Sequence, residues 1–187
     1  MPGSGSHVWI SDIMPVVIDQ IVNAIPGLTR DVVFQSVWTD EDHLKWPPAD
    51  RFIALYAHRF PVDQTDVTGG GTLNTAFDAQ IRATAFVRVE ADLENRSGQY
   101  LGDQVRGVQL FAKQIITALQ LFDPDGSAGA SGLKMLRWPM RVWGDWAVQP
   151  KSGGQNSRWG VCPINFVASY VSDLGYGFDG LPLIPGF

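Results

Sequence analysis

Three carboxylates recur at every second position in the stretch RVEADLE, namely Glu90, Asp92 and Glu94. In an extended strand, this spacing places all three side chains on one face. Paired carboxylates perform acid–base chemistry in glycoside hydrolysis, but here they end a strand and enter a loop, away from any aromatic cleft. We therefore interpret them as a solvated acidic edge, which would repel DNA phosphates weakly and suits the wall of a DNA channel.

The three histidines, His7, His43 and His58, match no metal-binding or catalytic spacing. We expect His58 to be a hydrogen-bonded histidine within a strand. The single cysteine, Cys162, lies in an alternating stretch that is typical of a buried strand, and it has no partner for an internal disulfide. The sequence thus predicts no catalytic residue, no metal site and no cofactor, and we expect the protein not to be an enzyme.

Two glycine-rich stretches resemble ligand-binding loops but lack their key residues. GGGTLNT has no Gly-Lys-Ser/Thr ending and precedes a strand, unlike a phosphate-binding loop. DPDGSAGASGLK opens like a calcium loop at Asp123 and Asp125. Its sixth position is Ala128 instead of glycine, and its twelfth is Lys134 instead of glutamate, which argues against an EF-hand.

Four tryptophans gather late in the chain: Trp138, Trp143, Trp146 and Trp159. Tryptophans of a strand-rich core or a subunit interface would explain this clustering. The alternative is a carbohydrate-binding or hydrolytic module that combines them with Glu90, Asp92 or Asp145. A pocketed enzyme that uses His58 is a weaker alternative.

The segment 75–92 is the clearest strand, because apolar and polar residues alternate along it almost without error. A strand of this length would reach roughly 60 Å, whereas ordinary strands have about 3–10 residues. We expect it to bend at a bulge or to run beyond the sheet as a free edge. One copy of the chain offers nothing against which to bury its far end, but a neighbouring subunit would.

The remaining pattern predicts helices at 12–24 and 97–123, strands at 31–38, 51–60, 140–149 and 158–171, and a mobile loop at 61–74. Ser11 is the expected N-cap of the first helix, Pro15 should fall in its first turn, and Gly107 should lie inside the second helix. The loop 150–157 makes a hairpin plausible. This order indicates an α+β fold: an antiparallel or mixed sheet with a long ribbon, and two main helices on one face.

The domain prediction is a flexible tail (1–10), one domain (11–171) and an extended C-terminal arm (172–187). Charged residues make up 18% of the chain, below the usual value of about 25%, which suggests that copies or partners cover part of the surface. The net charge of −5 argues against a basic surface that grips nucleic acid. No apolar run approaches the ~20 residues of a membrane span, and no signal peptide is recognisable, so we expect folding in a cytoplasm without membrane contact.

The order and texture of these elements resemble a known family. A first helix and strands, a GGG loop, the ribbon AFDAQIRATAFVRVEAD, the helix GVQLFAKQIITALQLFDP and the strand MRVWGDWAV resemble tail-terminator proteins of long-tailed bacteriophages and related head–tail neck components. The similarity covers roughly residues 11–172.

The resemblance implies a virion protein that is assembled in the host cytoplasm as a ring of six copies. Such a ring ends the tail tube, joins it to the head connector and lets DNA pass through a negatively lined lumen. The closest rival is a tail-tube or head-completion protein of the same machine. The candidate contacts with subunits or partners are Asp66, Gly69, Gly70, Gly71, Arg88, Glu90, Asp92, Tyr176, Phe178, Leu183 and Phe187.

Overall fold

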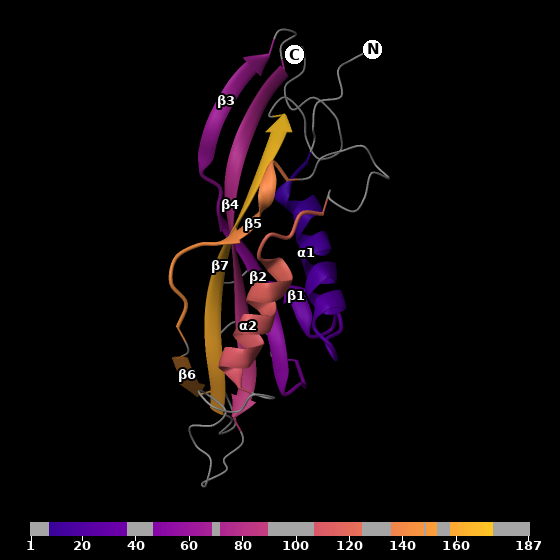
Figure 1. Ribbon diagram of the computed structural model, residues 1–187, viewed down its shortest axis with the longest axis vertical. Coiled ribbons are helices and arrows are strands. Elements are labelled where there is room, and N and C mark those ends of the chain that lie inside the picture. The colour runs from indigo at the N-terminus through magenta and orange to yellow at the C-terminus, as the bar shows by residue number, and fades with distance from the viewer. Residues whose placement is uncertain are drawn as a thin grey trace.

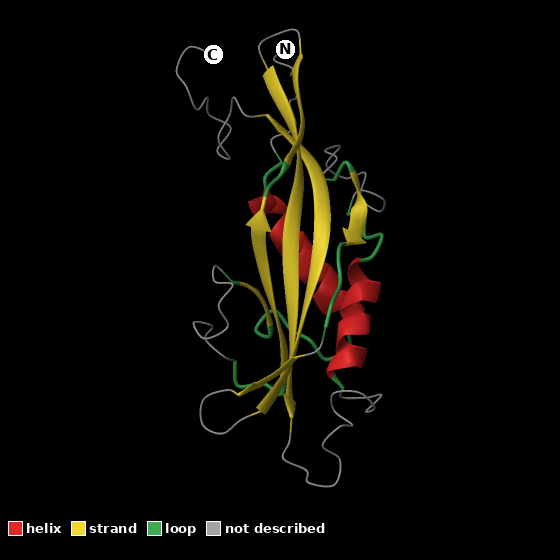
Figure 2. Cartoon of the chain, turned by 90° about the vertical axis from the view of Figure 1, so that its left-hand side faces the viewer, coloured by secondary structure: helices red, strands yellow, loops and turns green. Residues whose placement is uncertain are grey.

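The computed structural model describes residues 8–36, 47–68, 72–89, 107–124, 136–147, 149–152 and 158–173. Its elements are α1 (Ile10–Ala24), β1 (Val33–Gln35), β2 (Arg51–Arg59), β3 (Val62–Thr68), β4 (Thr72–Val89), α2 (Val108–Leu119), β5 (Trp138–Val142), β6 (Gln149–Ser152) and β7 (Arg158–Asp173). The strands form one seven-stranded sheet, and both helices lie on the same face of it (Figure 1, Figure 2). The predicted α+β class is therefore confirmed.

The two longest strands, β4 and β7, form the centre of the sheet. They pair antiparallel from Asn74 opposite Asp173 to Val89 opposite Arg158, without a register shift. Register shifts occur where β4 pairs with the short strands β2 and β3, and where β7 pairs with β5. Because neighbours line both of its sides, the 18-residue β4 is a central strand and not the free edge that the sequence suggested.

Each long strand is flanked by two short strands in succession. Along β4, β2 pairs with residues 80–87 and β3 pairs with residues 72–77. Along β7, β6 pairs near its start and β5 pairs near its end. The Asp78 amide donates to the Pro61 carbonyl at 2.9 Å, which keeps the chain beside β4 between β2 and β3. β1 pairs parallel with β2, and all other pairs are antiparallel.

The prediction of a mobile loop at 61–74 is wrong, because this segment contains β3 and the start of β4. The sequence VDQTDVT shows no apolar alternation, so its extended conformation depends on pairing with β4 instead of on its own burial pattern. β3 and the paired ends of β4 and β7 extend beyond both helices (Figure 1). The chain thus forms a hairpin that projects from the helix-covered body.

α1 begins two residues earlier than predicted. The Trp9 amide donates to the Asp12 carboxylate at 2.9 Å, so Asp12 caps the helix from inside its first turn and Ser11 is not the N-cap. Pro15 consequently lies beyond the first turn. Val8 is buried, so the packed chain begins inside the predicted tail.

Two further boundaries differ from the prediction. α2 begins at Val108 with Gly107 as its N-cap, so this glycine lies at the helix end and not in its interior. The predicted strand 140–149 is wrong beyond Val142: β5 ends there, Gly144 has a φ of 71°, and β6 begins only at Gln149. An antiparallel pair with β7 does form at the predicted hairpin, but its first strand is β6, most of which lies in the predicted loop 150–157. β7 continues to Asp173, and residues 174–187 of the predicted arm lie outside the described part.

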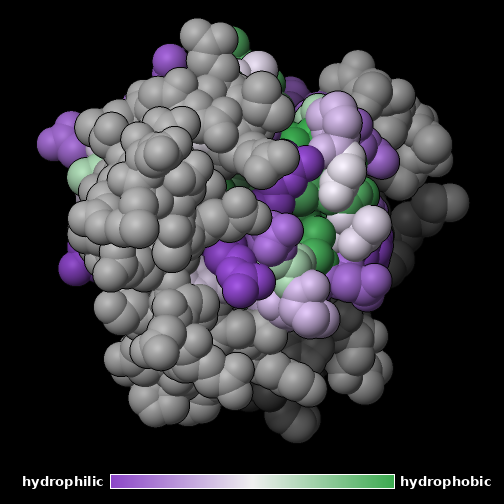
Figure 3. All heavy atoms as spheres, turned by 90° about the horizontal axis from the view of Figure 1, so that it is seen from below, coloured by the Kyte–Doolittle hydropathy of each residue, from purple (hydrophilic) through white to green (hydrophobic). Residues whose placement is uncertain are grey.

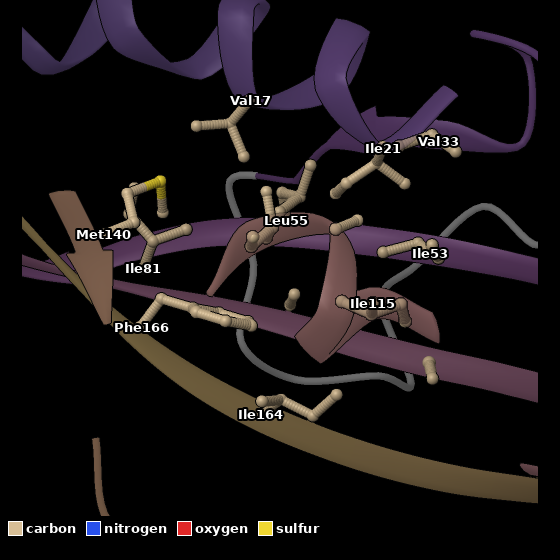
Figure 4. Close-up of a cluster of buried hydrophobic side chains, with 14 of the residues drawn as sticks. Val17, Ile21, Val33, Ile53, Leu55, Ile81, Ile115, Met140, Ile164 and Phe166 are labelled. Atoms are coloured by element: carbon tan, nitrogen blue, oxygen red, sulfur yellow. The ribbon is translucent and has the colours of Figure 1, made fainter. Parts of the chain in front are cut away.

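The main core lies between the helices and the sheet. Side chains from α1, α2 and the strands meet there, as Figure 4 shows for Val17, Ile21, Leu55, Ile81, Ile115 and Phe166. Ala79, Ala83 and Ala85 of β4 are fully buried, and their small size lets the helices approach the ribbon closely. Cys162 is also buried, as predicted, and burial raises the pKa of its thiol to about 11.

Candidate interaction surface

The two faces of the sheet differ in chemistry. Along β4, odd-numbered residues from Ala79 to Val87 enter the main core, so even-numbered residues lie on the opposite face. Among the described elements, no helix covers this opposite face (Figure 2). We call it the helix-free face.

One end of the helix-free face is a compact aromatic cluster. The rings of Phe52 and Phe86 stack with centroids 4.4 Å apart, and Trp159 meets Phe52 edge-on at 5.5 Å. All three side chains are buried, together with Ala54 and Val161. This end of the face is therefore a second core and not a binding platform.

Three arginines occupy the next part of the helix-free face, and we call them the arginine surface: Arg59, Arg82 and Arg141. Arg59 pairs with Gln80, Gln80 pairs with Val167, and Val167 pairs with Arg141. This register sets Arg59 and Arg141 at the two ends of one row across four strands, about 14 Å apart at the usual strand spacing. Arg82 lies two residues from Gln80 along β4, on the same face.

The arginine surface contains polar and aromatic neighbours but no carboxylate partner among the side chains that the structure describes. Arg82 Nε donates to Asn165 Oδ1 at 3.1 Å. The Tyr56 and His58 rings stack beside it with centroids 6.0 Å apart. The carboxylate of Asp78 also lies on this face, but it accepts a hydrogen bond from the Ser169 hydroxyl.

His58 reports the electrostatics of this surface. Burial lowers the pKa of His58, and the nearby Arg82 and Arg59 guanidinium groups lower it further; a hydrogen bond with the Tyr56 backbone acts in the opposite direction. Its Nδ1 atom is buried without a hydrogen-bond partner. The prediction of a hydrogen-bonded histidine is therefore wrong for this nitrogen. The two guanidinium groups beside the imidazole make this surface positive, which favours contact with an anion.

The outer edge of β5 is closed by the chain itself. The Leu121 amide donates to the Met140 carbonyl at 2.7 Å, and the Met140 amide donates to the Phe122 carbonyl at 2.9 Å. The Val142 amide donates to the side-chain oxygen of Gln120 at 2.8 Å. This segment acts as a short extra strand, and a copy of the chain would find few unpaired backbone groups along β5.

The outer edge of β3 is different. Within the described part of the chain, β3 pairs with β4 alone. Phe60 and Val62, at the base of the hairpin, are 42% and 58% exposed. Unpaired backbone next to exposed apolar side chains is typical of a surface that another chain covers.

Few of the predicted contact residues are described. Asp66 lies on β3. Arg88 is exposed at the end of β4, where its guanidinium lies 3.7 Å from the Asp50 carboxylate. From this end of the molecule, hydrophilic side chains border a small apolar area (Figure 3). The other predicted contacts lie outside the described residues: Gly69, Gly70, Gly71, Glu90, Asp92, Tyr176, Phe178, Leu183 and Phe187.

Trp143, Trp146 and Trp159, the described side chains of the tryptophan group, do not form the platform that a carbohydrate module would need. Trp159 is buried in the aromatic cluster, whereas Trp146 packs against the main core on the other side of the sheet. Trp143 is exposed beside Asn165, to whose carbonyl its amide donates at 2.8 Å. The Trp138 side chain is not described, and Asp145 is exposed to solvent.

Sequence reasoning missed the arginine surface. Arg82 occupies a polar position of the alternating ribbon, so its face could have been read from the pattern. Its grouping with Arg59 and Arg141 depends on the register of four strands, which no local pattern fixes.

Among the described residues, no group of histidine, cysteine, aspartate and glutamate side chains could hold a metal ion. Neither described helix is long and apolar enough to cross a membrane. Comparison with models of protein families gives no match, and a search among curated proteins finds no similar sequence.

Proposed function

We propose that this chain is a structural subunit that assembles with copies of itself into a closed ring. The ring is the tail terminator at the neck of a long-tailed bacteriophage: it ends the tail tube, binds the head connector and lets DNA pass. The protomer has no enzymatic role in this proposal. It assembles in the host cytoplasm and functions in the virion.

The projecting β3–β4 hairpin is the observation that carries this proposal. Its strands extend beyond the helix layer, and the outer edge of β3 has no strand partner in the described part of the chain (Figure 1). Exposed Phe60 and Val62 add apolar area at its base. A neighbouring copy would cover both features, and burial of apolar area is the main driving force of such association.

The contrast between the two edges supports a directional contact. A ring requires a head-to-tail interface, in which one patch of a subunit meets a different patch of the next. The β5 edge is closed by Gln120–Phe122, whereas the β3 edge is open. Two unlike edges on one protomer suit such an interface better than a symmetric dimer.

The identity of the ring as a tail terminator, and the number of six copies, rest on the resemblance in element order. A tail-tube subunit would also use a long hairpin, but it would stack into open tubes. A head-completion protein would form a ring with other partners. The size of the assembly separates tubes from rings.

The hairpin contact is tested by Val62→Glu, which places a charge on the exposed apolar base of the hairpin. We expect light scattering to give a smaller mass than for the wild type, with unchanged circular dichroism. Leu121→Glu is the matched control, because Leu121 is 71% exposed but lies beside the closed β5 edge. Equal masses for all three proteins would contradict the proposed contact.

A further inference from the structure

We propose that the arginine surface of one copy binds carboxylate side chains of a second copy of this chain. This inference rests on the proposed assembly and deepens it, because it names a surface and a chemistry for the contact between subunits. The hairpin argument does not depend on it.

The first argument is the pairing of the arginines. Two arginines elsewhere in the molecule meet carboxylates: Arg30 Nε donates to Asp19 Oδ1 at 2.8 Å, and Arg88 lies near Asp50. Within the described side chains, the three arginines of the arginine surface have no carboxylate partner. Arg59 and Arg141 are exposed, and Arg82 is half-buried against Asn165, a neutral partner.

The second argument is charge complementarity. The described residues contain ten of the 19 acidic and ten of the 14 basic residues, so they are neutral overall. The remaining segments therefore contain nine acidic and four basic residues, which account for the net charge of −5. One copy thus supplies both an unpaired basic surface and an excess of carboxylates, which guanidinium groups bind through charge-assisted hydrogen bonds.

The third argument is the charge around His58. Its ring lies on the same face as Arg59 and Arg82, and burial and both guanidinium groups lower its pKa. A carboxylate bound beside these groups would offset the positive charge of both arginines.

Nucleic acid is the competing anionic partner, since aromatic rings and arginines also form platforms for single strands. The excess of carboxylates within the chain favours the protein partner, because every copy of this chain supplies them. The experiment includes both.

The double variant Arg59→Glu/Arg141→Glu tests the inference at two exposed positions, where loss of folding is not expected. The control is Arg30→Glu/Lys113→Glu, which changes the net charge equally but alters residues of the helix-covered side. Sedimentation velocity over a range of concentration and salt measures assembly, and circular dichroism monitors the fold. We expect the test variant to require at least about tenfold more protein for half-assembly, the control to match the wild type, and added salt to weaken wild-type assembly.

Wild-type assembly that both double variants retain, or lose equally, would overturn this inference while leaving the proposed ring intact. A wild type that stays monomeric at all concentrations would refute the proposed function, and this inference with it. Binding of a labelled single-stranded oligonucleotide that is lost only in Arg59→Glu/Arg141→Glu, with assembly unchanged, would assign the surface to nucleic acid and also overturn the inference.

Discussion

The helix-covered and helix-free faces of the sheet use the same strands but different chemistry. On the covered face, small and branched apolar residues of β4 meet two helices, and nearly every side chain is fully buried. On the helix-free face, an aromatic cluster gives way to arginines, His58 and Asn165. The helix-covered face therefore stabilises the protomer, whereas the helix-free face leaves charged groups available to a partner.

The largest effect is expected for Val87→Arg, on the covered face. Val87 is 5% exposed, so the new guanidinium would be buried without a partner. We expect the free energy of unfolding to fall by about 5 kcal/mol or more, or folding to fail. Chemical denaturation provides the measurement. An unchanged midpoint would mean that the faces of β4 are assigned the wrong way round.

Phe86→Ala tests the neighbouring residue on the helix-free face. Phe86 is fully buried against Phe52, so we expect a loss of about 3–5 kcal/mol in the same denaturation experiment. Thr84→Ala, two residues away on the same face, is the matched control with a much smaller expected loss. A loss below about 1 kcal/mol for Phe86→Ala would show that the aromatic cluster is not a second core.

Gly27→Ala tests the contact between the turn that follows α1 and Arg51 of β2. Gly27 has a φ of 77°, and a Cβ there would lie 3.2 Å from Nη2 of Arg51, which donates to the Pro26 carbonyl at 2.7 Å. We expect the free energy of unfolding to fall by about 1–2 kcal/mol because alanine is strained in a left-handed backbone conformation. The displacement of Arg51 should lower it further. Gly144→Ala is the control, because its φ is 71° and no atom lies within 4 Å. Equal losses would exclude a contribution from Arg51.

Alkaline pH should weaken the covered face through Tyr170. Burial raises the pKa of Tyr170 to about 12 from its ordinary value of 10.0. The unfolded chain therefore loses this proton first, so stability is complete below about pH 10 and decreases as the pH rises towards 12. Tyr170→Phe should remove this part of the decrease, as urea midpoints over alkaline pH would show. An equal decrease in the stability of wild type and variant with rising pH would contradict this role of Tyr170.

The smallest effect is expected for Arg88→Ala. The Arg88 guanidinium lies 3.7 Å from the Asp50 carboxylate, and both side chains are largely exposed. Such pairs contribute about 0–1 kcal/mol, so the free energy of unfolding should change by less than about 0.5 kcal/mol. A loss of assembly without a change in stability would support Arg88 as a subunit contact.

The part of the fold that could be predicted is the part in which burial repeats along the sequence. The alternation from Ala79 to Val87 identified β4 and its buried face, because each apolar residue enters the core independently of its strand neighbours. The same reasoning found β2, β7 and both helices. It missed β3, whose strand structure depends on its pairing with β4.

The candidate surface was less predictable than the fold. Asp66 and Arg88 were chosen from a resemblance, whereas Arg59, Arg82 and Arg141 are brought together by strand register. Register depends on contacts between segments far apart in the sequence, so no local spacing reveals it. The unpaired Nδ1 of His58 likewise became visible only when its neighbours were placed.

The central claim is that copies of this chain close into a ring. Native mass determination of the purified protein, followed by negative-stain images of the main species, tests it most directly. The account predicts a discrete multiple of the 20.5 kDa protomer, near six copies, with a central opening. Open tubes, or a monomer that persists at high concentration, would contradict it.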